Sequence, residues 1–166
     1  MAKPYTPPAM ANHPPCGIYR TTQALEGIPP GRLVYFHNHG EPGPGIYLPE
    51  RWTHNRAQWQ ARGTTVPSAN WSASLAPIAA EGLYRVREEF TCCSKRCRTY
   101  EPGLLVQLGY DGEARPLLFV PEWTDAGMNF PTEGLKFENE NLGRLEPLKV
   151  SQPPPVPGAP RSPLLH

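Results

Sequence analysis

The sequence has almost no net charge and no long apolar run. Its 166 residues carry 16 Lys and Arg against 15 Asp and Glu, a net charge of +1. It therefore lacks the basic excess typical of proteins that coat nucleic acid. No stretch reaches the roughly 18 to 20 apolar residues of a membrane-spanning helix, and residues 1–15 lack the apolar core of a signal peptide. We expect a cytoplasmic protein whose four cysteines are reduced.

Catalytic signatures are also missing. The sequence contains no Gly-x-Ser-x-Gly nucleophile turn, no Walker-type phosphate loop and no Gly-x-Gly-x-x-Gly fingerprint. The letters of His37-Asn38-His39 match those of the HNH nucleases, but those enzymes draw their catalytic groups from separated positions. Three adjacent residues indicate the edge of a hairpin instead. We predict that the protein is not an enzyme and needs no cofactor.

Proline and glycine are abundant, at 23 and 15 residues, and both break helices. Eleven of the prolines lie in residues 1–15 and 151–166, where apolar periodicity is lacking. Such segments favour extended polyproline-II structure, which can dock on a partner at low entropic cost. We predict an N-terminal arm over 1–16 and a C-terminal arm over 151–166.

Between the arms, the sequence contains a tandem repeat. Residues 30–50 align with residues 102–122 without a gap and share 9 of 21 positions, where background composition gives about one or two. Further matches flank this block: Gly17-Ile18-Tyr19-Arg20 with Gly82-Leu83-Tyr84-Arg85, Trp52 with Trp123, and Gly63 with Gly134. The sequence predicts two copies, over 17–81 and 82–150. Because the two tryptophans match, we expect both as core or hinge residues.

The copies are predicted to be mostly β. Residues 32–36 and 104–108 are apolar runs bounded by turn residues, and 45–48 and 117–120 are their expected hairpin partners. Helix is expected only as a turn or two within 55–62 and 70–82. In strand order and length, each copy resembles the small β-barrels of the SH3-like type. The predicted fold class is therefore two tandem, duplicated SH3-like barrels with proline-rich extended termini.

Alternation along the strands assigns their faces. Val34 and Phe36 share one face, which we expect to form the core, and Tyr35 lies on the other. The second copy has Gln107 in place of Tyr35, so we expect this other face to be wetter. Pro49 and Pro121 are expected to end their strands, because proline cannot donate a hydrogen bond to a central ladder.

Three of the four cysteines lie in an insertion of the second copy, at Cys92, Cys93 and Cys97. Their spacing partly fits a zinc site, which takes four Cys or His ligands. The candidates to complete it are Cys16, His13, His37, His39 and His54. The alternatives are a disulfide, unmodified thiols, or a reactive cysteine whose pKa is lowered by Lys95, Arg96 and Arg98.

Aromatic and basic residues give two candidate surfaces. One is a groove for an extended or proline-rich partner, lined by Tyr35, Tyr47, Trp59 and Trp71; the alternative is that these side chains fill a small core. The other is a basic face composed of Arg85, Arg87, Lys95, Arg96 and Arg98. Acidic residues interrupt this face, which indicates a solvated surface rather than contact with nucleic acid.

These observations favour binding over catalysis. We predict an assembly subunit or adaptor that docks on a larger protein complex through its β-domains and its arms. One competing hypothesis is a small metal or redox protein centred on Cys92, Cys93 and Cys97. The other is a tandem barrel that binds nucleic acid through the basic face, and we expect proteins rather than nucleic acid as partners.

Overall fold

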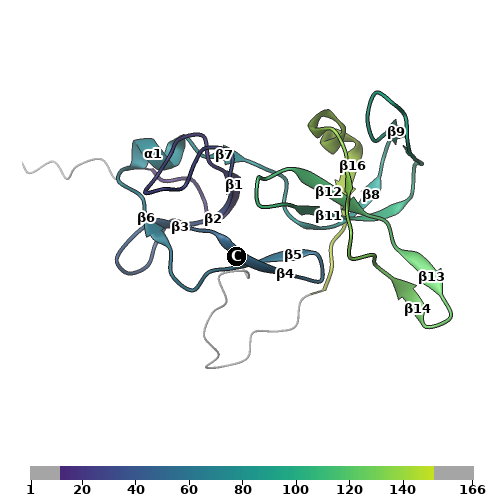
Figure 1. Ribbon diagram of the computed structural model, residues 1–166, viewed down its shortest axis with the longest axis horizontal. Helices are drawn as coiled ribbons and strands as arrows, with labels where there is room; N and C mark the ends of the chain where they lie inside the picture. Colours follow the sequence, from purple (N-terminus) through teal and green to yellow (C-terminus); the bar gives the residue numbers. More distant parts are fainter. Residues whose placement is uncertain (1–11, 152–166) are drawn as a thin grey trace, which may run out of the picture.

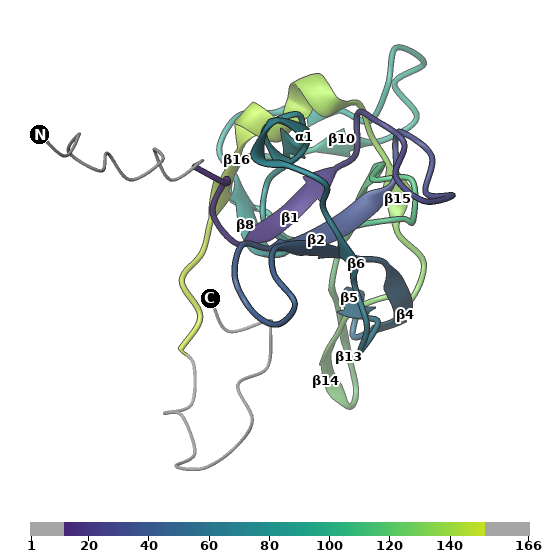
Figure 2. The same ribbon diagram turned by 90° about the vertical axis from the view of Figure 1, so that its left-hand side faces the viewer.

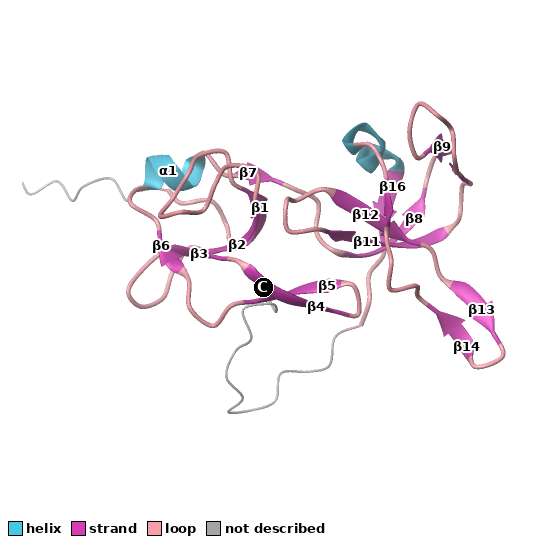
Figure 3. Cartoon of the chain, in the orientation of Figure 1, coloured by secondary structure: helices cyan, strands magenta, loops and turns pink. Residues whose placement is uncertain are grey.

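The computed structural model describes residues 12–151. Strands make up 41% of these residues and helices 8%, and Figure 3 shows mainly strands and loops. The expectation of a mostly β protein is confirmed. Of the predicted arms, residues 1–11 and 152–166 lie outside the described part of the chain.

A first five-stranded antiparallel sheet has the order β6-β3-β2-β1-β7. Its strands are β1 (Gly17–Arg20), β2 (Leu33–His37), β3 (Gly45–Tyr47), β6 (Thr64–Thr65) and β7 (Ala76–Pro77). Helix α1 (Ala69–Ala73) begins after Ser68, whose hydroxyl accepts the N–H of Trp71 as an N-cap. This short helix falls in one of the two segments where a turn of helix was expected.

A second antiparallel sheet has the order β15-β12-β11-β8-β16. Its strands are β8 (Gly82–Val86), β11 (Leu105–Tyr110), β12 (Pro116–Phe119), β15 (Leu135–Lys136) and β16 (Leu145–Pro147), and the 3-10 helix η1 (Asn139–Arg144) precedes β16. The strands follow the same order as in the first sheet, and the registers correspond, with Gly17 opposite Phe36 and Gly82 opposite Leu108. Within the described residues neither sheet closes into a barrel, because its two end strands do not pair with each other.

Three two-stranded hairpins complete the fold: β4 (Pro49–Thr53) with β5 (Arg56–Trp59), β9 (Phe90–Thr91) with β10 (Thr99–Tyr100), and β13 (Glu122–Thr124) with β14 (Gly127–Asn129). Figure 1 shows the two sheets side by side, with β4–β5 reaching from the first sheet toward the second. The β13–β14 hairpin follows the corresponding strand of the second sheet, but it projects away from the body of the protein in both Figure 1 and Figure 2.

Each sheet covers its own hydrophobic cluster. The first cluster contains Val34, Phe36 and Trp71, and the second contains Val106 and Leu108. Two further members of the second cluster, Leu33 and Ala57, come from the first half of the chain. The two halves therefore share buried apolar surface, which relieves the shortage of core in units of this size.

The face expected to be wetter is buried. Tyr35 and Gln107 are only 3% and 8% exposed, because the β4–β5 hairpin and the neighbouring sheet cover this side of the strands. Two local expectations are also wrong in the β4–β5 hairpin. Residues 55–62 contain strand β5 instead of a helical turn, and Pro49 begins β4 instead of ending a strand. The first position of a strand suits proline, since its missing N–H is not needed there.

Candidate functional site

The β4–β5 hairpin binds the second sheet through its tryptophan. The indole Nε1 of Trp52 donates a hydrogen bond of 2.8 Å to the carbonyl of Tyr110, at the end of β11. Its ring lies beside Gly112, where an added Cβ would be 3.9 Å from the ring, in a hollow that Leu117 and Phe119 also line. Trp52 is 43% exposed, so this contact covers its side chain only in part.

The tip of the same hairpin lies against β11. His54 and Asn55 adopt positive φ angles of 50° and 64°, which form a tight turn that suits asparagine. Asn55 Nδ2 donates to Gln107 Oε1 at 3.1 Å, and Gln107 Nε2 donates to the His54 carbonyl at 2.8 Å. Gly109 allows this approach, because a Cβ at that position would lie 2.7 Å from the carbonyl oxygen of Asn55. The contact thus combines apolar packing with reciprocal hydrogen bonds.

Glu81 supports the hairpin from the segment before β8. Its carboxylate oxygens accept the N–H of Ala57, on β5, at 3.2 and 3.3 Å. Burial raises the pKa of Glu81 from its ordinary value of 4.5 to about 7, against the opposing effects of the Ala57 N–H and the charge of Arg56. The carboxyl group therefore changes its charge near neutral pH.

The β13–β14 hairpin corresponds to the β4–β5 hairpin, but no sheet covers its tryptophan. Trp123 lies opposite Met128, as Trp52 lies opposite Ala57 in the first hairpin. Trp123 is 83% exposed and Met128 is 48% exposed, whereas Ala57 is 1% exposed. The expectation that Trp52 and Trp123 are both core or hinge residues is wrong for Trp123. The match between the two tryptophans predicted equivalent positions, but which one is covered depends on tertiary packing.

The four residues of the predicted groove lie in different surroundings. Tyr35 is buried, with its ring centroid 5.7 Å from that of Trp59. Trp71 is 7% exposed and belongs to the first hydrophobic cluster, on the face of β2 opposite Tyr35. Tyr47 is half-buried and lines a separate hollow with Gly63. The structure therefore brings Tyr35 and Trp59 together, pairs Tyr47 with Tyr35 across β2 and β3, and places Trp71 on the opposite face of the sheet.

Several members of the predicted basic face are already engaged. Arg85 pairs with Glu146 at 2.6 Å and Arg87 with Glu88 at 3.3 Å. The guanidinium of Arg98 lies 5.5 Å from the centre of the Tyr100 ring. These contacts lie on the surface, and they pair the basic side chains with residues of the same chain.

Cys92, Cys93 and Cys97 gather in the loop that joins β9 to β10. The Sγ atoms of Cys92 and Cys93 are 3.6 Å apart, and those of Cys93 and Cys97 are 3.9 Å apart. The pKa of Cys93 is lowered, chiefly by its hydrogen bond with Cys92. The backbone N–H groups of Lys95 and, to a smaller extent, Cys97 lower it further. The hydrogen bond with Cys93 raises the pKa of Cys97. A hydrogen bond is the largest cause of each pKa shift, and the neighbouring basic charges, which were expected to lower a cysteine pKa, are not among the causes.

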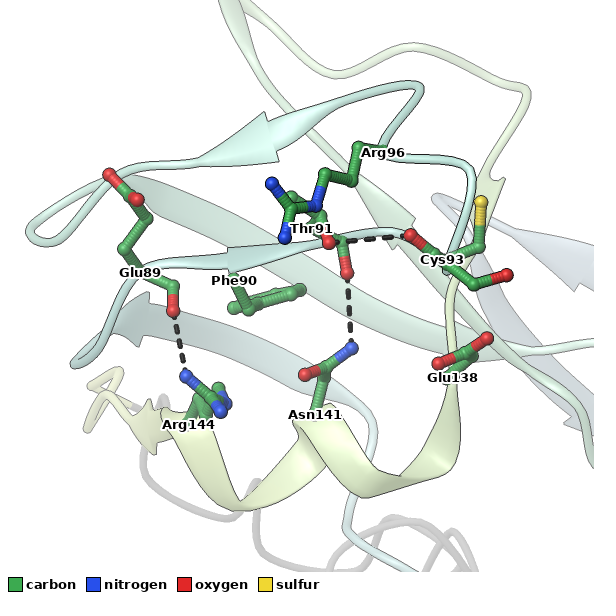
Figure 4. Close-up of a pocket in the computed structure, with 9 residues that line it drawn as sticks. Glu89, Phe90, Thr91, Cys93, Arg96, Glu138, Asn141 and Arg144 are labelled. Atoms are coloured by element: carbon green, nitrogen blue, oxygen red, sulfur yellow. Dashed lines mark hydrogen bonds between the residues drawn. The ribbon is translucent and has the colours of Figure 1, made fainter.

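A hollow of about 520 Å³ lies beside this loop, between β9 and η1. Figure 4 shows Asn141 and Arg144 reaching from η1 toward the strand. Asn141 Nδ2 donates to the Thr91 carbonyl at 3.1 Å, and Arg144 Nη1 donates to the Glu89 carbonyl at 2.8 Å. The sulfur of Cys93 points away from both side chains. These two hydrogen bonds brace the helix against the strand.

Cys16 does not join the other three cysteines. It lies next to His37 and His39, so the candidate ligands divide into two clusters. His13 instead contacts the Ser72 hydroxyl at 2.8 Å, and His54 lies in the turn of the β4–β5 hairpin. All four cysteines are free thiols. Sequence spacing alone did not predict the second cluster, because Cys16 and His37 are brought together by the pairing of β1 with β2.

Comparison with known proteins finds no match: no family model, no curated protein and no solved structure corresponds to the chain. Among residues 12–151, no helix has the length and apolar character needed to cross a membrane.

Proposed function

We propose that the protein is a non-enzymatic assembly subunit that docks on another protein through its β-domains, with the β13–β14 hairpin as the principal contact. The proline-rich arms would extend over neighbouring subunits. We also infer that the two sheets arose by duplication of one SH3-like unit. The shared strand order and the corresponding registers support this inference.

The exposure of Trp123 is the observation that carries the proposal. Trp123 is 83% exposed on a projecting hairpin and lies opposite a half-exposed methionine. Its apolar surface therefore contributes no packing energy to the folded chain. Tryptophan is also among the residues enriched at the energetic centres of protein interfaces. The free face of this hairpin is therefore suited to a partner.

The docked hairpin indicates what such a partner would offer. Trp52 uses a backbone carbonyl at the end of a strand and an adjoining apolar surface. Trp123 presents the same indole N–H and ring from the corresponding position. A partner with an accessible carbonyl beside an apolar patch on a β-sheet would satisfy both groups.

Photo-cross-linking tests the proposal in the cells that make the protein. A photoreactive phenylalanine analogue at position 123 is expected to give a discrete cross-linked species, and the analogue at exposed Glu101 is expected to give none. Co-expression with the neighbouring genes should place the chain in a large species by size-exclusion chromatography, and Trp123→Ala should release it. A chain that stays monomeric and forms no cross-link at position 123 would contradict the proposal.

A metal or redox role for Cys92, Cys93 and Cys97 is the second candidate. Three thiolates around a tetrahedral zinc ion lie about 3.8 Å apart, given Zn–S bonds of about 2.3 Å. The two distances of 3.6 and 3.9 Å are close to this value. The lowered pKa of Cys93 also favours the thiolate that a metal requires.

Alkylation of the thiols tests this second candidate. Zinc is expected to slow the alkylation of Cys93 at least about tenfold by occupying its sulfur. The exposed Cys97 can be replaced without disturbing the core, and Cys97→Ser should remove most of this protection. Equal alkylation rates with and without zinc in the unaltered chain would exclude the site.

A further inference from the structure

A thiol and two imidazoles meet at one end of the first sheet. The pairing of Gly17 with Phe36 places Cys16, one residue earlier, beside His37, one residue later. The Sγ atom of Cys16 lies 3.4 Å from Nδ1 of His37 and 3.7 Å from Nδ1 of His39. The two imidazole centroids are 4.0 Å apart, and the three potential ligand atoms all lie within 4.8 Å of one another.

These separations are those of ligands around a tetrahedral zinc ion. With Zn–S near 2.3 Å and Zn–N near 2.0 Å, a sulfur and a nitrogen on the same ion lie about 3.5 Å apart. The two observed sulfur–nitrogen distances, 3.4 and 3.7 Å, fall on either side of this value. An ion at the centre of the cluster would thus bind all three atoms with little movement of the backbone.

Asn38 holds the cluster together and offers a further oxygen. Its backbone N–H donates to Cys16 Sγ at 3.3 Å. Its side-chain Oδ1 lies 3.2 Å from the same sulfur and 2.8 Å from Nδ1 of His39. The amide Nδ2 donates to the carbonyl of Pro14 at 3.2 Å, which fixes the side chain. Oδ1, or a water molecule, could therefore occupy the fourth coordination position.

The corresponding place in the second sheet shows that the fold does not require these residues. By strand register, Glu81 stands at the position of Cys16 and Gly109 at that of His37. There Gly109 gives room to the tip of the β4–β5 hairpin, and Glu81 accepts a backbone N–H of that hairpin. Corresponding places in the two sheets thus hold a docked hairpin in one and a cluster of a thiol and two imidazoles in the other.

We propose that Cys16, His37 and His39 bind a divalent transition-metal ion, zinc before others. On binding, the ion displaces the proton of the Cys16 thiol and accepts a lone pair from Nδ1 of each imidazole. For His39 this requires the proton that Nδ1 donates to Asn38 Oδ1 to move to Nε2. The proton passes to solvent, so binding tightens as the pH rises. The ion would fasten the segment before β1 to the end of β2. This proposal is independent of the function proposed for the β13–β14 hairpin.

Cobalt spectroscopy on the full chain tests the site. The Cys93→Ser/Cys97→Ser variant dismantles the other cluster while it keeps the buried Cys92, so a thiolate signal can come from Cys16. One equivalent of Co²⁺ is expected to give thiolate-to-cobalt charge transfer with the intense visible bands of tetrahedral cobalt. One equivalent of Zn²⁺ should abolish both.

Substitutions in that background identify the ligands. His39→Ala, at an exposed position, is expected to weaken Co²⁺ binding by at least about tenfold, and Cys16→Ser to remove the charge-transfer band. His54→Asn is the matched control: it removes a histidine outside the cluster and suits the positive φ of the hairpin turn. Circular dichroism checks that each variant is folded. The proposal is overturned if cobalt gives no thiolate band, or if His39→Ala and His54→Asn bind cobalt equally well.

Discussion

Glu81→Gln is expected to remove a loss of stability that the unaltered protein shows between about pH 4.5 and 7. The pKa of Glu81 is raised to about 7 in the folded chain, chiefly by burial, so the folded state binds this proton more tightly than the unfolded state does. The stability that protonation provides is complete below the unfolded pKa of 4.5 and disappears as the pH passes through 7. The difference in pKa corresponds to about 3 kcal/mol.

Glutamine is the informative substitution because it stays neutral and can still accept the Ala57 N–H. The free energy of unfolding, measured by urea denaturation from pH 4 to 8, should fall by about 3 kcal/mol more in the unaltered chain than in the variant. Glu101→Gln changes an exposed carboxyl group and serves as the control. Parallel stability curves for the unaltered chain and Glu81→Gln would show that the buried carboxyl group does not govern this pH dependence.

The strands of the two sheets were predictable because their signal is local. Apolar runs between turn residues predicted β2, β3, β11 and β12 to within about two residues at their ends. The alignment of 30–50 with 102–122 predicted corresponding positions, and the two sheets have the same strand order. The position of β9 and β10 also agrees with the predicted insertion, since both strands lie between β8 and β11.

Features that depend on tertiary contact were not predictable from these local patterns. Nothing near Tyr35 or Gln107 in the sequence indicates that a hairpin covers their face of the sheet. The barrel expectation considered strand order and length, but closure depends on pairing between end strands, which the described sheets lack. The helix expected in 55–62 failed because Ala57 and Trp59 alternate toward the interior with a period of two.

The candidate ligands illustrate the same distinction. Cys92, Cys93 and Cys97 are within six residues of one another, so their proximity could be expected from the sequence. Cys16 and His37 are 21 residues apart and meet only because β1 pairs with β2 in one register. Shifting that register by one residue would turn one strand's side chains to the other face and separate the ligands. Knowledge of the register was therefore needed before this cluster could be recognised.

Replacing each of the two matched tryptophans by alanine is expected to affect the stability of the isolated chain very differently. Trp52→Ala removes a hydrogen bond to Tyr110 and the ring that packs beside Gly112, and should lower the free energy of unfolding by about 2 kcal/mol. This is less than the cost for a fully buried tryptophan, because Trp52 is 43% exposed. Trp123→Ala should change the stability by no more than about 0.5 kcal/mol.

Chemical denaturation of both variants measures this contrast, and the unaltered chain supplies the reference. The two variants are well matched, because each tryptophan lies on the first strand of its hairpin. The two tryptophans differ from each other chiefly in whether a sheet covers the side chain. A large loss of stability in Trp123→Ala would mean that its side chain already has a folding role, and the hairpin would not be a free docking element. If Trp123→Ala leaves the isolated chain intact but removes it from the large species formed on co-expression, the exposed indole serves association and not folding.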